Sequence, residues 1–306
     1  MRAGYAEVLL STLVAAAATL QVLNPFLPAM HAWWVAPATG LAGLYLLIGG
    51  LGTVLRGGGS RLGALAALGG ALLAGGLVFA ALLVGQPQRV PAVPGQTYRP
   101  PNSASVEVSY PDVTVLPSGA GPAWPDFVSV VEGRRTISAR DGDVVRTGGF
   151  VFSVQNGPIA YVDARSPQGK PVTVTQPDGP AFLSPFLTFN GLDGDKPEDF
   201  FRVPALFRDV QVDYWSGLPS RGIDIPFLAL RVTEQNDASG RALYEGVAVS
   251  GRPLNKAGVS LRFALGVYPV VMMSSAPPVL PFAAGAAMFA VGWIGFAARS
   301  LRSGHA

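Results

Sequence analysis

Residues 62–85 read LGALAALGGALLAGGLVFAALLVG, and residues 86–101, which follow directly, read QPQRVPAVPGQTYRPP. The first stretch contains no charged residue and is long enough to cross the hydrocarbon core of a bilayer, about 30 Å, as an α-helix. The second stretch is dense in proline, which excludes a long helix and favours extended backbone. The boundary between them predicts a membrane helix that leads into a domain outside the membrane.

Three other runs of the chain are equally apolar. They span residues 6–27, 33–55 and 278–298, and Glu7 is the only acidic residue in them. Each has about the 20 residues that a membrane helix requires. The sequence therefore predicts an integral membrane protein with four transmembrane α-helices, three N-terminal and one C-terminal, and a domain inserted between the third and the fourth.

Arginines at the ends of these runs indicate the orientation of the helices. If the chain crosses four times, they all lie on one face, which the positive-inside rule makes cytoplasmic. We therefore expect a multi-pass protein of the inner (plasma) membrane with both termini cytoplasmic and the large domain extracytoplasmic. A signal peptide is the alternative for the first run, but no small-x-small cleavage site follows it. The five arginines are Arg2, Arg56, Arg61, Arg299 and Arg302.

The charge distribution excludes one class of function, and the absence of cysteine excludes others. Residues 86–275 hold 17 of the 22 Lys and Arg and 18 of the 19 Asp and Glu, so this segment is almost neutral. Nucleic-acid binding would need basic residues clustered on the folded domain, so no nucleic-acid partner is expected. Without cysteine the chain forms no disulfide, no Cys-ligated zinc site and no covalent link to a c-type haem.

The sequence divides into four regions. We expect a three-helix membrane region at 1–85, a Pro-rich extended connection at 86–125, an extracytoplasmic β-rich domain at 126–275, and a C-terminal transmembrane helix with a cytoplasmic tail at 276–306. Short apolar runs between Gly, Asp and Pro favour an inserted all-β domain, either a sandwich or an open barrel. The strand candidates are 135–138, 149–155, 159–163, 171–175, 210–214, 227–233 and 243–249.

Glycines are frequent in the second and third apolar runs. In lipid, small residues let helix backbones approach closely, which predicts a tight helical bundle. The alternative is a face kept small for a partner membrane protein or a flat cofactor. These glycines are Gly40, Gly43, Gly49, Gly50, Gly52, Gly69, Gly70, Gly75 and Gly76.

Two short motifs are too incomplete to predict a ligand. Residues 57–59 are three glycines, but the Lys-Ser/Thr that completes a phosphate-binding loop does not follow them. The acidic stretch from Asp193 to Asp199 lacks the regular oxygen spacing and terminal Glu of a calcium loop. We expect a flexible turn at the first and a solvated loop at the second.

Histidines, the commonest catalytic and metal-binding side chains, are nearly absent. The chain has two: His31, between the first two apolar runs, and His305 in the C-terminal tail. Neither a Ser-His-Asp triad nor a His-ligated metal site can therefore form from residues 86–275. We assign no catalytic residue and no metal site, and expect a protein that is not an enzyme. Trp33 and Trp34 follow His31 closely and stand where aromatic rings prefer the membrane interface.

Three stretches carry a resemblance to a known family. His31-Ala-Trp-Trp opens the second apolar run, residues 61–75 form the start of the third, and residues 244–249 (YEGVAV) precede Arg252-Pro-Leu and Gly258-Val. With three spans, an inserted β-rich domain and a final span, these stretches resemble the ResB, or CcsB, family of system II cytochrome c biogenesis. The corresponding family features are a His-Ser-Trp-Trp opening of span two, the third span, and a strand followed by an Asn-x-Pro-Leu turn.

The resemblance implies a non-catalytic assembly factor for c-type cytochromes. Such a protein lies in the lipid bilayer, pairs with a CcsA-like haem-handling membrane protein and receives apocytochrome c. Family members carry a His in the third span that is thought to ligate haem, and Ala67 stands in that place here. Because a methyl group cannot coordinate iron, we expect no stoichiometric haem on this chain alone, and the resemblance leaves haem possible in a complex. The resemblance also makes His31, Trp33 and Trp34 candidate haem contacts, because indole rings can stack on a porphyrin.

A second class of function stays open. The chain is short for the family, and the late Asn of the family motif is replaced here by Ser250 or Gly251. The alternative is a structural or sensing membrane protein, whose exported β-domain binds an envelope partner or a respiratory complex.

Overall fold

The structure is a computed structural model that divides the chain into two compact units. The first comprises residues 1–88, 146–153 and 272–306, and the second comprises residues 89–145 and 154–271. The structure describes residues 2–23, 26, 34–56, 61–83, 87–101, 103, 105–115, 121–147, 149–176, 185–189, 191–193, 196–235, 240–276 and 279–303.

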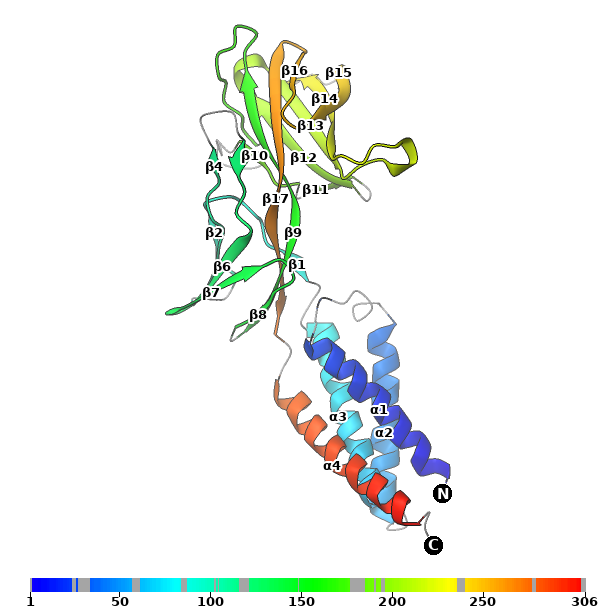
Figure 1. The fold of residues 1–306 in the computed structure, drawn as a ribbon. Coiled ribbons are helices and arrows are strands. Elements are labelled where there is room, and N and C mark those ends of the chain that lie inside the picture. Colours follow the sequence, from blue (N-terminus) through cyan, green and yellow to red (C-terminus); the bar gives the residue numbers. More distant parts are fainter. Residues whose placement is uncertain are drawn as a thin grey trace. The chain divides into compact units, whose positions relative to one another are not determined.

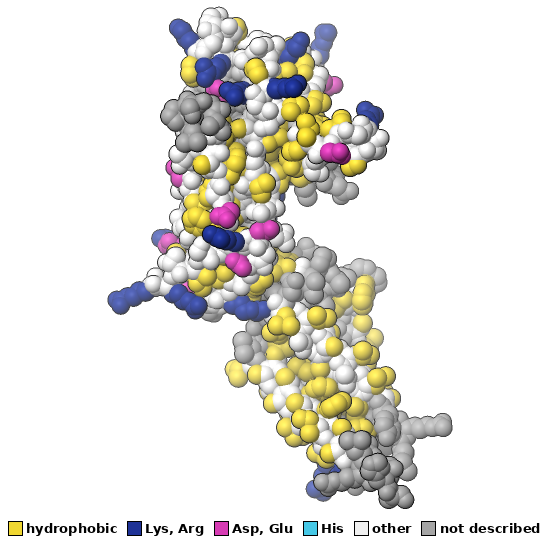
Figure 2. Space-filling view, viewed as in Figure 1, with side chains coloured by type: hydrophobic (Ala, Val, Ile, Leu, Met, Phe, Trp, Pro, Cys, Tyr) yellow, Lys and Arg dark blue, Asp and Glu magenta, His cyan; other side chains and the backbone are white. Residues whose placement is uncertain are grey.

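Four long helices form most of the first unit. They are α1 (Arg2–Leu23), α2 (Val35–Arg56), α3 (Arg61–Leu83) and α4 (Val279–Ser303). Each contains a candidate membrane span, which covers Ala6–Leu23, Val35–Leu55, Arg61–Ala81 and Leu280–Arg299 respectively. On the face shown in Figure 2, hydrophobic side chains cover the described part of these helices, whereas charged side chains lie mainly on the β-rich unit. The prediction of a multi-pass membrane protein with three N-terminal helices and one C-terminal helix is confirmed.

Helix α3 is the centre of this bundle and contacts each of the other three helices. Two of its glycines, Gly69 and Gly70, lie at crossings where a side chain would collide with a neighbouring helix. A Cβ built on Gly70 would lie 2.7 Å from the Cβ of Ser11 on α1, and one on Gly43 of α2 would lie 2.8 Å from the Cβ of Ala74. For these residues the tight-bundle interpretation holds. At Gly52 and Gly75, by contrast, no described atom lies within 4 Å of a built Cβ.

The segment between α3 and α4 is a region of antiparallel β-structure, as expected (Figure 1). Its strands are β1 (Gln88–Arg89), β2 (Thr97–Tyr98), β3 (Val106–Ser109), β4 (Thr114–Val115), β5 (Pro122–Ala123), β6 (Phe127–Glu132), β7 (Arg135–Arg140), β8 (Val144–Arg146), β9 (Phe150–Arg165), β10 (Phe186–Leu187), β11 (Gly191–Asp193), β12 (Lys196–Val203), β13 (Arg208–Trp215), β14 (Phe227–Glu234), β15 (Ala242–Val249), β16 (Pro253–Lys256) and β17 (Val259–Ser275). Two short 3₁₀ helices, Pro204–Leu206 and Pro219–Arg221, connect neighbouring strands.

The described strands form four sheets. A six-stranded sheet has the order β1-β17-β9-β10, with β16 paired to β17 and β8 paired to β9. A five-stranded sheet has the order β11-β12-β13-β14-β15, a four-stranded sheet the order β2-β3-β6-β7, and β4 pairs with β5. Strands β3 and β6 pair from Val106↔Glu132 to Ser109↔Ser129, so the Pro-rich segment takes part in a sheet.

A hydrophobic core joins the five-stranded sheet to β9 and β17. Alternate residues of β14, from Leu228 to Val232, are buried on one face of the sheet, as period-2 patterning requires. They pack with Val162 of β9 and with Phe263 of β17 in one buried cluster. This packing favours the sandwich, one of the two architectures that the strand-length runs predict, over the open barrel.

Two expectations about individual strands are wrong. Residues 149–155 and 159–163 were expected as separate strands, but both belong to β9, which runs through Asn156-Gly-Pro without a turn. Residues 171–175 form only isolated bridges, Pro171 with Arg165 and Thr175 with Arg202. Pairing of β9 with the 17-residue β17 overrides the local turn signal, because β-structure depends on neighbouring strands more than on local residue preference.

The prediction of a solvated acidic loop is also wrong for the residues that the structure describes. Asp193 ends β11 and Asp199 lies in β12. The carboxylate of Asp199 is half-buried and accepts backbone hydrogen bonds, so it belongs to the fold rather than to a solvated loop.

Candidate functional site

The three residues predicted to contact haem are only partly described. His31 and Trp33 lie outside the described residues, so their role stays a prediction. Trp34 lies directly before α2, where its carbonyl accepts a hydrogen bond from the Ala38 amide, N···O 3.0 Å, and 55% of the residue is exposed. An exposed indole is available for stacking, but the structure brings no described iron ligand to it.

Ala67, at the place of the family's intramembrane His, faces the inside of the bundle. It is fully buried in a cluster with Leu46 of α2, Leu73 of α3 and Phe282 of α4. A ligand at this position would point into the helix core, but the alanine provides none. Among the described residues, no group of three His, Asp or Glu side chains is placed to hold a metal ion.

An apolar pocket of about 560 Å³ lies within the first unit, between α1 and α4. Leu73 of α3 lies beneath it, and Phe282 and Phe289 of α4 form one wall. Much of the remaining lining is alanine, which explains the empty space between two helices that both pack on α3. This lining comprises Ala15, Ala18, Thr19, Val22 and Leu23 of α1, Ala283 and Ala286 of α4, and Arg146, Thr147, Val151 and Ala276.

Among the described residues that line this pocket, Arg146 has the one charged side chain. Its Nη2 donates hydrogen bonds to the carbonyl oxygens of Val22 and Leu23, the second with an N···O distance of 2.9 Å. These carbonyls end α1, where the helix leaves its last four C=O groups without an intrahelical partner. The guanidinium therefore caps the negative end of α1, and the pocket has one apolar end and one cationic end.

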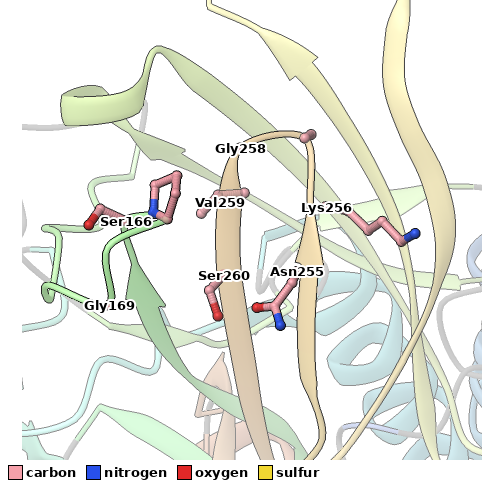
Figure 3. Close-up of a pocket in the computed structure, with 9 residues that line it drawn as sticks. Ser166, Gly169, Asn255, Lys256, Gly258, Val259 and Ser260 are labelled. Atoms are coloured by element: carbon pink, nitrogen blue, oxygen red, sulfur yellow. The ribbon is translucent and has the colours of Figure 1, made fainter.

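A second, polar pocket of about 640 Å³ lies in the β-rich unit (Figure 3). It is formed by the turn that follows β9, with Ser166 and Gly169, and by the hairpin of β16 and β17. Asn255 and Ser260 are directly opposite in the hairpin register, so their side chains share a face, while Figure 3 shows Lys256 pointing away. The described residues of its lining include no acid and no histidine.

The tip of this hairpin is a strained two-residue turn. Ala257 has φ 52° and Gly258 has φ 74°, as a type I′ hairpin turn requires. Arg208 holds the tip in place, because its Nε donates to the carbonyl oxygen of Ala257 over 2.7 Å. The turn is thus fixed from the five-stranded sheet.

A half-buried cluster of Arg89 and Asp199 in the β-rich unit, in which both side chains bond to the same backbone segment, was not recognised from the sequence. Asp199 accepts hydrogen bonds from the amides of Thr188 (2.8 Å), Phe189 (3.0 Å) and Phe200 (2.7 Å). Arg89 donates to the carbonyl oxygens of the same Thr188 and Phe189, over 3.2 and 3.1 Å. Together the two side chains fix a backbone corner at which Phe189 has φ 49°.

Burial controls the ionisation of this cluster. It raises the pKa of Asp199 above its usual value, against the opposing effect of the three amide hydrogen bonds and of Arg89. Burial also raises the pKa of Tyr110, whose ring stacks on Tyr268 with centroids 6.1 Å apart. The arrangement stabilises the fold and presents no exposed nucleophile. In the sequence, Asp199 is the last residue of an acidic stretch. Its position alone does not distinguish it from an exposed surface aspartate.

No protein-family model matches the chain, and no curated protein matches it.

Proposed function

We propose that this chain is a non-catalytic, ResB-like assembly factor for c-type cytochromes that pairs with a CcsA-like membrane protein. The observation that carries the proposal is the packing of α4 on α3. Gly69, inside the stretch that resembles the family's third span, contacts the backbone of α4 at Gly285 and Phe289. In the family's order of elements, a last span follows the inserted β-domain. In this chain that last span, α4, packs directly on α3.

The chain's part in haem delivery would be that of a scaffold. Ala67 offers no ligand to iron, and the described residues that line the apolar pocket include no His, Met or Tyr. The axial ligands would then come from the partner's histidines, and this chain would position the partner in the membrane.

The β-rich unit would receive apocytochrome. Strand β15, which contains the YEGVAV motif, ends the order of the five-stranded sheet and so has one edge without a strand partner among the described strands. Leu243 and Val247 on this strand are about half exposed. An unfolded polypeptide can add to such an edge as a further strand, with main-chain hydrogen bonds supplying affinity without strict sequence preference.

The test is deletion of the gene followed by complementation. Deletion is expected to abolish or strongly lower haem-stained c-type cytochromes, and the full chain should restore them. In mild detergent the chain should co-purify with a CcsA-like protein identified by mass spectrometry, and the complex should show a Soret band. Normal cytochrome levels in the deletion strain would overturn the proposal.

Ala67 favours one competing function, a structural or sensing membrane protein whose β-domain binds an envelope partner or a respiratory complex. Because Ala67 stands where the family's His is thought to ligate haem, this chain lacks the side chain that ties the family to haem. In that case cytochrome levels stay normal after deletion, and the co-purified protein is an envelope or respiratory subunit without haem-handling spans.

A further inference from the structure

We infer that the pocket between α1 and α4 binds one acyl chain of an anionic phospholipid, with the lipid phosphate bound by Arg146. This inference does not rest on the proposed role in cytochrome assembly. It follows from the shape of the pocket, from its lining and from the position of its single charge.

The dimensions of the pocket suit one lipid chain. The lining extends from Ala15 to Leu23 on α1 and from Phe282 to Phe289 on α4, about 12 Å and about 10 Å at 1.5 Å per residue. One leaflet contributes about half of a 30 Å hydrocarbon core, so the pocket covers most of a leaflet. Its volume of about 560 Å³ also lies within the range of ligand pockets, about 300–1,000 Å³.

The lining is suited to hydrocarbon. Small alanine side chains of both helices line the pocket, and the rings of Phe282 and Phe289 add apolar surface. The pocket occupies the C-terminal part of α1, which ends at Leu23, and the N-terminal part of α4, which begins at Val279 directly after the β-rich segment. A lipid chain would therefore enter from the leaflet on that side.

Arg146 adds the requirement for an anionic head group. Its Nη2 is bound to the end of α1, while its Nε and Nη1 make no hydrogen bond to any residue that the structure describes. The side chain is exposed, so these two donors can reach a ligand. A guanidinium presents its donors in a planar fork that matches two phosphate oxygens. The apolar lining below it then places the acyl chain directly under the phosphate.

Haem, which also combines apolar surface with anionic groups, fits the pocket less well. Stable haem binding needs an axial ligand to iron, and the lining residues that the structure describes include no His, Met or Tyr. An acyl chain needs no such ligand. The same lining therefore favours a phospholipid.

Native mass spectrometry of the full chain tests this inference. The protein in mild detergent is incubated with equal amounts of phosphatidylglycerol and phosphatidylcholine that carry identical acyl chains. We expect one phosphatidylglycerol to be retained in preference to phosphatidylcholine. Arg146→Gln should reduce this preference roughly fivefold, because the attraction of one arginine to an anionic lipid surface corresponds to about a fivefold change in affinity. Arg146→Lys, which keeps the charge, should retain most of it.

Matched variants separate the pocket from general effects. Ala286→Leu fills the pocket and should abolish retention of both lipids, whereas Ala287→Leu, on the same helix outside the lining, should leave it unchanged. Arg134→Gln in the exposed β6–β7 turn controls for charge. Equal retention of the two lipids by the wild type, or unchanged retention in Ala286→Leu, overturns the inference. A Soret band that appears with added haem and is lost in Ala286→Leu would overturn the inference, because it would show that the pocket binds haem rather than a lipid.

Discussion

Gly69 and Phe289 lie in direct backbone contact. A Cβ built on Gly69 would lie only 2.4 Å from the amide nitrogen of Phe289 and 2.8 Å from the carbonyl oxygen of Gly285. Gly292 repeats this contact one to two turns further along α4, where a built Cβ would lie 2.3 Å from the amide nitrogen of Ala66. The backbones of helices α3 and α4 (Figure 1) therefore lie in contact, through residues 220 positions apart in the chain.

The first prediction concerns this crossing. Gly69→Leu should separate α4 from α3 and lower the stability of the protein in detergent by about 1–3 kcal/mol or more, the usual cost of overpacking. Gly75→Leu is the matched control on the same helix, because no described atom lies within 4 Å of a Cβ built there. Thermal unfolding followed by tryptophan fluorescence measures both. Equal midpoints for the two variants would show that the contact is not important for stability.

The hairpin tip provides a second prediction. Ala257 has φ 52°, where a side chain costs about 1–2 kcal/mol, so Ala257→Gly should stabilise the protein, by about 0.5–1 kcal/mol after the added chain entropy of glycine. Gly258→Ala at φ 74° should destabilise it by a similar amount. Denaturant midpoints of the two variants and the wild type check these opposite signs. A destabilised Ala257→Gly would mean that the strain is relieved in solution.

The third prediction concerns pH. Because burial raises the pKa of Asp199 above the unfolded value of 3.8, the folded state holds this proton to higher pH than the unfolded state does. The free energy of unfolding should then fall as pH rises from about 3.8 through the raised pKa, since the folded protein binds more protons in that window. Asp199→Asn removes this contribution. The midpoint difference between wild type and variant, measured from pH 3.5 to 7, should shrink or reverse as pH rises, and a growing difference would mean a lowered pKa.

The fourth prediction is the orientation that the arginines indicate. Reporter fusions at Gly58, Gly157 and the C-terminus should report cytoplasmic, extracytoplasmic and cytoplasmic positions. Four candidate spans require that the two termini lie on one side, whichever side this is. If all three reporters lie on the opposite sides, the four crossings hold but the proposed orientation is wrong. If Gly58 and the C-terminus lie on different sides, the chain does not cross the membrane four times.

The fifth prediction concerns haem. The full chain purified without its partner should be nearly colourless, because Ala67 cannot ligate iron. In cells, His31→Ala should lower the yield of c-type cytochromes if His31 contacts haem in the complex. His305→Ala, in the C-terminal tail, is the control and should leave the yield unchanged. A Soret band near one haem per chain in the partner-free protein would show that other ligands are present.

The helical part of the fold was predictable because its determinants are local. Run length and the absence of charge are sufficient to specify α1 to α4, since a membrane helix satisfies all its backbone hydrogen bonds within the segment. Strands β13, β14 and β15 were recognised for a related reason, namely the alternation that one buried face imposes. By contrast, β9 was divided in two at Asn156-Gly-Pro, because a turn signal is local whereas its pairing with β17 is not.

The sequence by itself thus determined four apolar helices, an inserted all-β region and the absence of any cysteine or histidine chemistry in residues 86–275. Only the tertiary structure decided which glycines form crossings, and it alone turned Asp199 from a presumed loop residue into a half-buried acceptor of three amides. Likewise, Arg146 meets the end of α1 across 124 and 123 residues of chain. Contacts of this kind depend on how distant elements pack, and no local pattern of residue types encodes the partner.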